Sequence, residues 1–306
     1  MFKFIFLLFV PIVLFGACHA LVNDEFADTV QVPVLNAVLQ ADSSIKVHVS
    51  LSAKLSDAAP FFASNALVSI TDSDGNIDTL KHTLDGWYSS KLVARVGKTY
   101  TCVAKLTGFK TIEASTTVPH PTVIDSLVFT DNANRGEEGE KISAITFRLH
   151  NNKAIHSFWE IKLKSRGMQS VFDMDSKTFI EEFTVQNRYF YIRPEQDSVM
   201  LSEPSPLEVF SNRKMKGNTH QVKLYVDEYA LRVSESDTLF IELNSIDQSF
   251  YNYKKSLYIY VNSNSGGLGS MAQNYKLHTN VKNGLGLFTA TSVSSKDFEL
   301  INSTIQ

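Results

Sequence analysis

Short stretches in which apolar and polar residues alternate recur along this chain, and they restrict its fold more than any other feature. In residues 45–51 every second side chain is apolar, so one face of an extended strand would be hydrophobic. Turn-forming residues separate this stretch from others of the same kind. The pattern predicts further strands at residues 66–70, 98–106, 124–129, 142–149, 158–163, 189–192, 220–226 and 287–293.

A proline pair marks the clearest boundary in the chain. Pro119 and Pro121 hold the backbone extended and have no N–H to donate to a sheet. We therefore predict a mainly β fold in two parts. An N-terminal immunoglobulin-like β-sandwich would span residues 31–118, and a larger β-rich domain with one amphipathic helix would span residues 119–306.

The helix is predicted near residues 245–261, because apolar side chains there step by four and three residues. Ser245 would cap its first turn, and Asp247 would suit the positive end of the helix dipole. The stripe most naturally covers a sheet, and it consists of Ile246, Phe250, Tyr253, Leu257 and Tyr260.

The N-terminus has the pattern of an export signal. Lys3 precedes an apolar run that ends at Phe15, which is shorter than the roughly 20 residues needed to span a bilayer. Because Cys18 follows two small residues, we expect residues 1–17 to be a signal peptide, Cys18 to be lipidated and residues 18–30 to form a tether. The alternative is cleavage after Ala20, which would release a soluble protein.

Composition excludes some classes of function and leaves others open. A formal net charge of −3 without a basic stripe argues against nucleic-acid binding. Of the 2 cysteines, Cys18 is expected to carry lipid, so Cys102 would be an unpaired, buried strand residue. The acids at Asp72 and Asp74 lack the spacing of a calcium loop, and they favour a hairpin turn.

Motifs of catalysis and of metal binding are missing from the sequence. There is no Gly-x-Ser-x-Gly segment, and the spacing of His150 and His156 fits no zinc motif. We therefore predict no catalytic residues, no metal site and no cofactor. An enzyme whose catalytic residues are scattered along the sequence stays an alternative.

Several segments, taken in order, resemble one protein family. They are the cysteine-ended signal and residues 49–52, 97–101, 116–119, 245–247, 251–253 and 283–288. Together they are similar to the Bacteroidota lipoproteins grouped as domain of unknown function 4249. Phe15 departs from the usual lipoprotein signal, which has Leu three residues before the cysteine. The resemblance implies an outer-membrane lipoprotein that is associated with TonB-dependent transporters in nutrient uptake. Separately, Asp24 and Glu25 resemble the surface-export signals of some Bacteroidota lipoproteins, which predicts exposure on the cell surface, and a solvated tether is the alternative.

Under this hypothesis the protein is a non-enzymatic accessory that binds a ligand or a transporter through exposed aromatic side chains. The candidate ligand-binding residues are Trp87, Trp159, Tyr251 and Tyr258, each of which could instead be part of the core. The alternative function is a surface structural or adhesion protein that binds glycans or host matrix. Bacteroidota also glycosylate exported proteins after Asp, and the matching positions are Thr29, Thr79, Ser126, Ser198 and Thr238. These Asp-Ser/Thr pairs could equally mark turns that lead into strands.

Overall fold

The computed structural model describes residues 30–53, 61–136, 139–190, 197, 199–200, 208–227, 231, 238–264 and 275–298. The chain divides into two compact units, residues 1–31 and residues 32–306, and all elements named below belong to the second. The predicted signal peptide, Cys18 and nearly all of the tether lie outside the described residues. Within the described part, no helix has the length and apolar character needed to cross a membrane.

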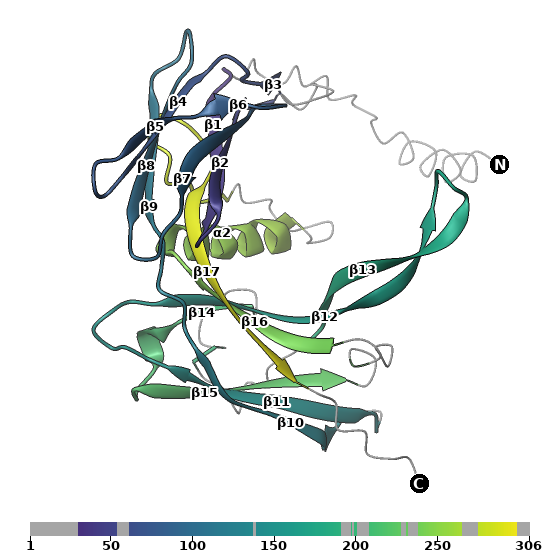
Figure 1. Ribbon diagram of the computed structural model, residues 1–306. Helices are drawn as coiled ribbons and strands as arrows, with labels where there is room; N and C mark the ends of the chain where they lie inside the picture. Colours follow the sequence, from purple (N-terminus) through teal and green to yellow (C-terminus); the bar gives the residue numbers. More distant parts are fainter. Residues whose placement is uncertain are drawn as a thin grey trace, which may run out of the picture. The chain divides into compact units, whose positions relative to one another are not determined.

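A ten-stranded sheet runs through the second unit (Figure 1). Its strands follow the order β13 (Thr178–Arg188), β12 (Phe158–Asp173), β16 (Thr238–Ile246), β17 (Phe288–Phe298), β1 (Pro33–Gln40), β2 (Ser44–Leu51), β7 (Trp87–Val93) and β6 (Lys81–His82). Two short strands pair beside this path, β14 (Val209–Ser211) with β12 and β3 (Phe61–Phe62) with β2.

Two smaller sheets pack near opposite ends of the large one. The first has the order β5 (Ile77–Thr79), β4 (Leu67–Asp72), β8 (Thr99–Lys105) and β9 (Ile112–Thr117). The second has the order β10 (Ile124–Arg135), β11 (Lys141–His150) and β15 (Thr219–Asp227). A 3₁₀ turn, η1 (Asn212–Lys214), and one long helix, α2 (Gln248–Asn264), complete the described elements.

Each smaller sheet closes its own hydrophobic core. The first core takes inward residues of β1, β2 and β7 together with the four-stranded sheet. The second takes inward residues of β12 and β16 together with the three-stranded sheet. The mainly β fold is therefore confirmed, and its stacked sheets agree with a sandwich. The immunoglobulin-like detail and the division at residue 118 stay predictions.

Strand β17 connects the two cores. Its first half pairs in parallel with β1, and its second half pairs antiparallel with β16. Consequently Phe288 and Ala290 are buried in the first core, although they come from the far end of the chain. Residues on both sides of the prolines thus contribute to one continuous sheet.

The structure corrects the predicted start of the helix. Ser245 is the penultimate residue of β16 and does not cap the helix, and Ile246 also belongs to that strand. The cap is Asp247, whose Oδ1 accepts the backbone N–H of Phe250 at 2.7 Å. The apolar stripe therefore begins at Phe250.

Cys102 lies in β8 as predicted. It is fully buried and is a free cysteine, and burial raises the pKa of its thiol to about 12. The thiol therefore stays protonated at neutral pH and acts as a small hydrophobic side chain.

Candidate functional site

The start of α2 is tied to two strands by a single carboxylate. Asp247 accepts hydrogen bonds from the hydroxyls of Thr289 in β17 and Thr116 in β9, in addition to the backbone N–H of Phe250. Both threonines are buried. Because hydrogen bonds to a charged group are strong, these contacts fix the first turn of the helix against the sheet.

After the helix, residues 285–287 run along the edge of β1 as a continuation of its backbone pairing. Leu285 N–H donates to the carbonyl of Pro33, and Leu35 N–H donates to the carbonyl of Leu285, both at 2.9 Å. Gly286 has a φ of +105°, and a Cβ there would come within 2.2 Å of the Leu35 carbonyl oxygen. This close approach requires glycine, and it holds residues 285–287 against the strand.

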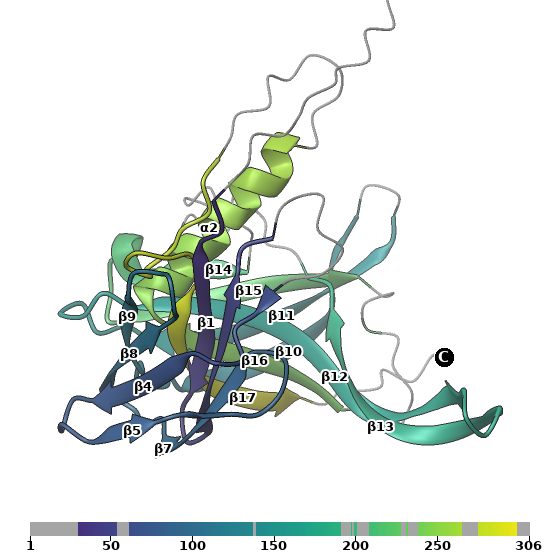
Figure 2. The same cartoon turned by 90° about the horizontal axis from the view of Figure 1, so that it is seen from above.

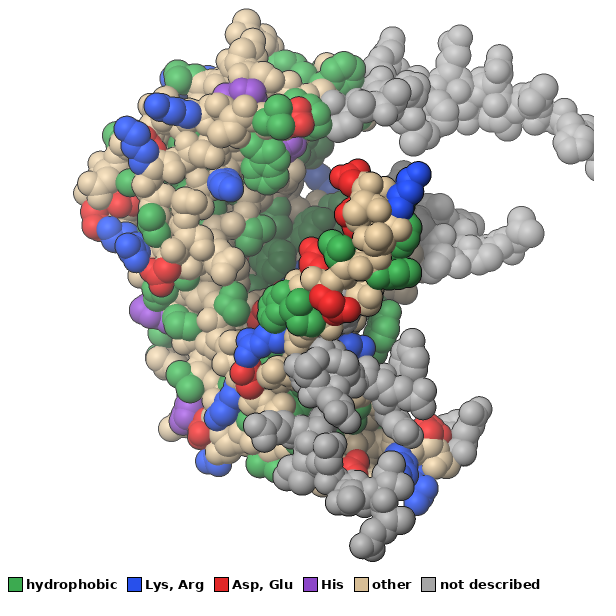
Figure 3. Space-filling model, turned by 45° about the vertical axis from the view of Figure 1, so that its right-hand side comes forward, with side chains coloured by type: hydrophobic (Ala, Val, Ile, Leu, Met, Phe, Trp, Pro, Cys, Tyr) green, Lys and Arg blue, Asp and Glu red, His purple; other side chains and the backbone are tan. Residues whose placement is uncertain are grey.

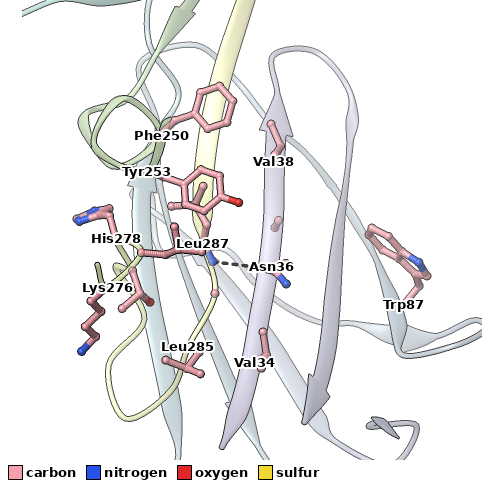
Figure 4. A pocket seen from close by; sticks show the side chains of 14 residues that line it. Val34, Asn36, Val38, Trp87, Phe250, Tyr253, Lys276, His278, Leu285 and Leu287 are labelled. Carbon is pink, nitrogen blue, oxygen red and sulfur yellow. Dashed lines mark hydrogen bonds between the residues drawn. The ribbon is translucent and has the colours of Figure 1, made fainter. Parts of the chain in front are cut away.

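A pocket of about 510 Å³ lies between this returning segment, α2 and β1 (Figure 4). Phe250 and Tyr253 enter it from the helix, and Val34 and Val38 enter it from β1. Its walls are mostly apolar and its size falls in the range typical of small-molecule sites. The pocket is therefore the candidate binding site.

Few polar groups line the pocket, and one of them already takes part in a hydrogen bond within the protein. The Asn36 side-chain oxygen accepts the Leu287 N–H at 3.0 Å, as the dashed line in Figure 4 shows. His278 differs, because its Nε2 is buried and has no hydrogen-bond partner among the described residues. Burial lowers the pKa of His278, and the charge of Asp247 acts in the opposite direction.

Of the four aromatic residues proposed from the sequence, Trp87 lines the pocket. In Figure 4 it stands on the opposite side of β1 from Phe250 and Tyr253. Its side chain is 44% exposed, and its ring lies 5.0 Å from the ring of His48. An exposed indole beside a pocket suits contact with a ligand.

Two of the other three aromatic residues are structural. Trp159 is 1% exposed, stacks on Phe210 and donates its Nε1–H to Thr122 at 2.8 Å. Tyr251 is also buried, where it packs against Phe158. Both were named as ligand-binding candidates with a core position as the alternative, and the structure places both side chains in a core. Tyr258 is exposed on α2 but does not line the pocket.

The candidate glycosylation positions fall in different surroundings. Thr79 and Ser126 are exposed, whereas Thr238 is half-buried at the start of β16. Thr29 and Ser198 lie outside the described residues, as does the predicted lipidation site Cys18. Whether any of these residues is modified stays a prediction.

Sequence reasoning did not identify Tyr253, Phe250 or His278 as site residues. The first two were recognised only as part of an apolar helical stripe, and that signal is the same for a core helix and for a pocket wall. His278 carried no signal, since its surroundings come from segments distant in sequence. Among the described residues, no group of three or more His, Cys, Asp or Glu side chains is placed to hold a metal ion.

A protein-family model matches this chain. No curated protein matches the sequence. The model of the family described as "Domain of unknown function (DUF4249)" matches residues 22–297, which is most of the chain. The chain therefore belongs to this family of unknown function.

Proposed function

We propose that this protein is a lipid-anchored, non-enzymatic component of an outer-membrane, TonB-dependent nutrient uptake system. In this role it binds a ligand in the pocket between β1 and α2. The anchor is the acylated Cys18, and the body from β1 onward carries the binding site.

The observation that carries the binding role is the pocket itself. It combines apolar walls with Trp87 at one side and an imidazole nitrogen of His278 that has no hydrogen-bond partner in the described part of the chain. Binding sites for small molecules share this composition of many apolar groups and few polar ones. The lipid anchor is proposed from the N-terminal sequence pattern, and the outer-membrane location and the transporter partner are proposed from the family resemblance.

The anchor is tested by metabolic labelling with a radioactive fatty acid. Wild type should incorporate label and fractionate with outer membranes, whereas Cys18→Ala should lose both properties. Cys102→Ala is the matched control and should remain labelled. Secretion of unlabelled wild-type protein that begins at Leu21 would overturn the anchor.

The partner is tested by solubilising outer membranes in mild detergent and purifying the tagged protein. A TonB-dependent transporter should co-purify in stoichiometric amount. If none does, the uptake role fails, although the pocket can still be tested separately.

A surface adhesion role is the alternative, and one observation favours it. The outer part of the β12–β13 hairpin carries exposed aromatic side chains, among them Phe172, Phe179 and Phe183. Exposed aromatic surface commonly marks contact with glycans or proteins. Glycan-array binding that is lost on Phe179→Ser, without transporter co-purification, would favour adhesion.

A further inference from the structure

The pocket has an asymmetric distribution of chemical groups. Most of its wall is hydrocarbon or aromatic, contributed by Val34, Val38, Phe250, Tyr253, Leu285 and Leu287. The basic side chains among the described lining residues come from the segment that returns after the helix, at Lys276 and His278. A ligand that matches this distribution has an apolar body and a polar group at one end.

The polar end of the pocket favours a negative charge. Among the described residues that line the pocket, no side chain is acidic. The described residues give Lys276 no ion pair or hydrogen-bond partner for its ammonium group, and it also lines the adjoining cavity beside Lys255. A cation beside an apolar site attracts an anionic ligand and fixes the orientation in which that ligand binds.

The nearest acid does not cancel this preference. Asp247 influences His278 electrostatically. Its carboxylate oxygens, however, accept hydrogen bonds from Thr116, Thr289 and the Phe250 backbone. Because of these contacts, the carboxylate of Asp247 is engaged at the first turn of the helix. The imidazole Nε2 is buried and has no hydrogen-bond partner among the described residues, so a ligand that reaches it would gain a hydrogen bond.

We infer that the pocket binds an amphipathic carboxylate, with its apolar body between β1 and α2 and its carboxylate at Lys276 and His278. The body would lie across Val38 and Tyr253, and the ammonium group of Lys276 would pair with the carboxylate. The imidazole of His278 would donate one N–H hydrogen bond to the carboxylate. This inference rests on the ligand-binding part of the proposed function and defines its ligand class.

Three probes with the same twelve-carbon tail separate the contribution of the head group. They are dodecanoate and dodecyltrimethylammonium, each used below its micelle concentration, and dodecan-1-ol, used below its solubility limit. The full chain carrying Cys18→Ala is used, because it cannot be acylated and can be handled without detergent. Isothermal titration calorimetry should show dodecanoate binding about tenfold tighter than the alcohol, with the cation weakest.

Variants assign the contacts. Lys276→Gln should weaken dodecanoate binding about tenfold and leave dodecan-1-ol unchanged. Lys105→Gln, an exposed lysine in β8 away from the pocket, is the matched control and should have no effect. His278→Phe should weaken dodecanoate more than the alcohol, and Tyr253→Ala should weaken all three probes. Circular dichroism of each variant checks that it is folded.

Two results would overturn the inference. One is equal affinity for the carboxylate and the alcohol, with Lys276→Gln silent, which would leave an apolar site without head-group selection. The other is that no probe binds. Neither result affects the tests of the lipid anchor or of the transporter, so failure of this inference is distinguishable from failure of the uptake role.

Discussion

Strand β12 shows two environments within one strand. In its first half, Trp159, Ile161 and Leu163 are at most 1% exposed, because β14 and β16 pair with this half and the second core covers it. In its second half, Met168 and Phe172 are 47% and 46% exposed. Beyond Arg166 the register with β16 ends, and β13 is the only partner among the described strands.

The second half of β12 and the strand β13 therefore form a projecting two-stranded ribbon (Figures 1 and 2). Phe172 lies directly opposite Phe179, with ring centroids 5.3 Å apart. Figure 3 shows this ribbon with hydrophobic and acidic side chains mixed on its surface. The comparison teaches that backbone pairing and cross-strand contacts can extend a sheet where no core covers it.

The largest expected difference between the two environments is in the cost of removing an aromatic ring. Trp159→Ala should lower the free energy of unfolding by about 3–5 kcal/mol, because it opens a cavity in the second core. Phe179→Ala, on the ribbon, should change it by less than about 0.5 kcal/mol. Urea unfolding of both variants measures this. A loss at Phe179 as large as that at Trp159 would show that the ribbon is covered.

A smaller difference in stability is expected when a carboxylate is neutralised in each of the two environments. Glu160 in the first half of β12 is 1% exposed, and Lys254 and Lys162 lie 2.8 and 2.9 Å from its oxygens. Burial alone would raise the pKa of Glu160, yet these two ammonium groups hold that pKa below its usual range.

Replacing this charge should therefore cost stability. Glu160→Gln should destabilise the protein by about 2 kcal/mol, less than for a fully buried pair because both lysines are partly exposed. Glu181→Gln on the exposed ribbon is the matched control, and it should stay within about 0.5 kcal/mol of wild type. Chemical unfolding at neutral pH provides both values. Equal losses of stability would show that the buried ion pairs of Glu160 add nothing beyond an exposed carboxylate.

The smallest expected effect is on the pH dependence of the melting temperature, and it is compared between two hairpin turns. Hydrogen bonds from Asn76 lower the pKa of Asp72, the last residue of β4 before its turn, to about 2. A hydrogen bond from Ser176 also lowers the pKa of Asp173, the last residue of β12 before the ribbon turn. A folded-state pKa below the unfolded value means that the stabilisation is complete above pH 4 and is lost as pH falls toward 2.

Asp72→Asn should therefore reduce the melting temperature at pH 5, and the difference from wild type should shrink by pH 2.5. Asp173→Asn should follow the same direction with a smaller change. Calorimetric scans at the two pH values test this. A difference that is constant with pH would mean that neither carboxylate is stabilised by its turn.

Local sequence patterns were sufficient for several elements. The predicted strands at residues 45–51 and 98–106 match β2 and β8, because one face of each is buried and the alternation survives in the sequence. Asp247 was recognised as suited to a helix start. By contrast, β16 was missed since most of its residues are buried, so it shows no alternation. The outer half of β12 was missed because its apolar residues stay exposed.

The candidate site depended much less on local pattern. Trp87 was proposed because a large aromatic residue can bind ligands, but the same reasoning also selected Trp159, which lies in a core. Exposure separates these two residues, and it is set by the sheets that pack around them. Phe250 and Tyr253 became pocket residues only because residues 276–287 return along β1.

By itself, the sequence determined the β class, the position of the helix to within a few residues and the burial of Cys102, because these follow from side-chain periodicity over short distances. The tertiary structure decided that β17 joins β1 in parallel and continues beside β16. It thereby also decided that a pocket forms between β1 and α2. Parallel pairing joins segments about 250 residues apart through backbone hydrogen bonds. Backbone groups are the same at every residue except proline, so the local pattern carries no record of which partner they find.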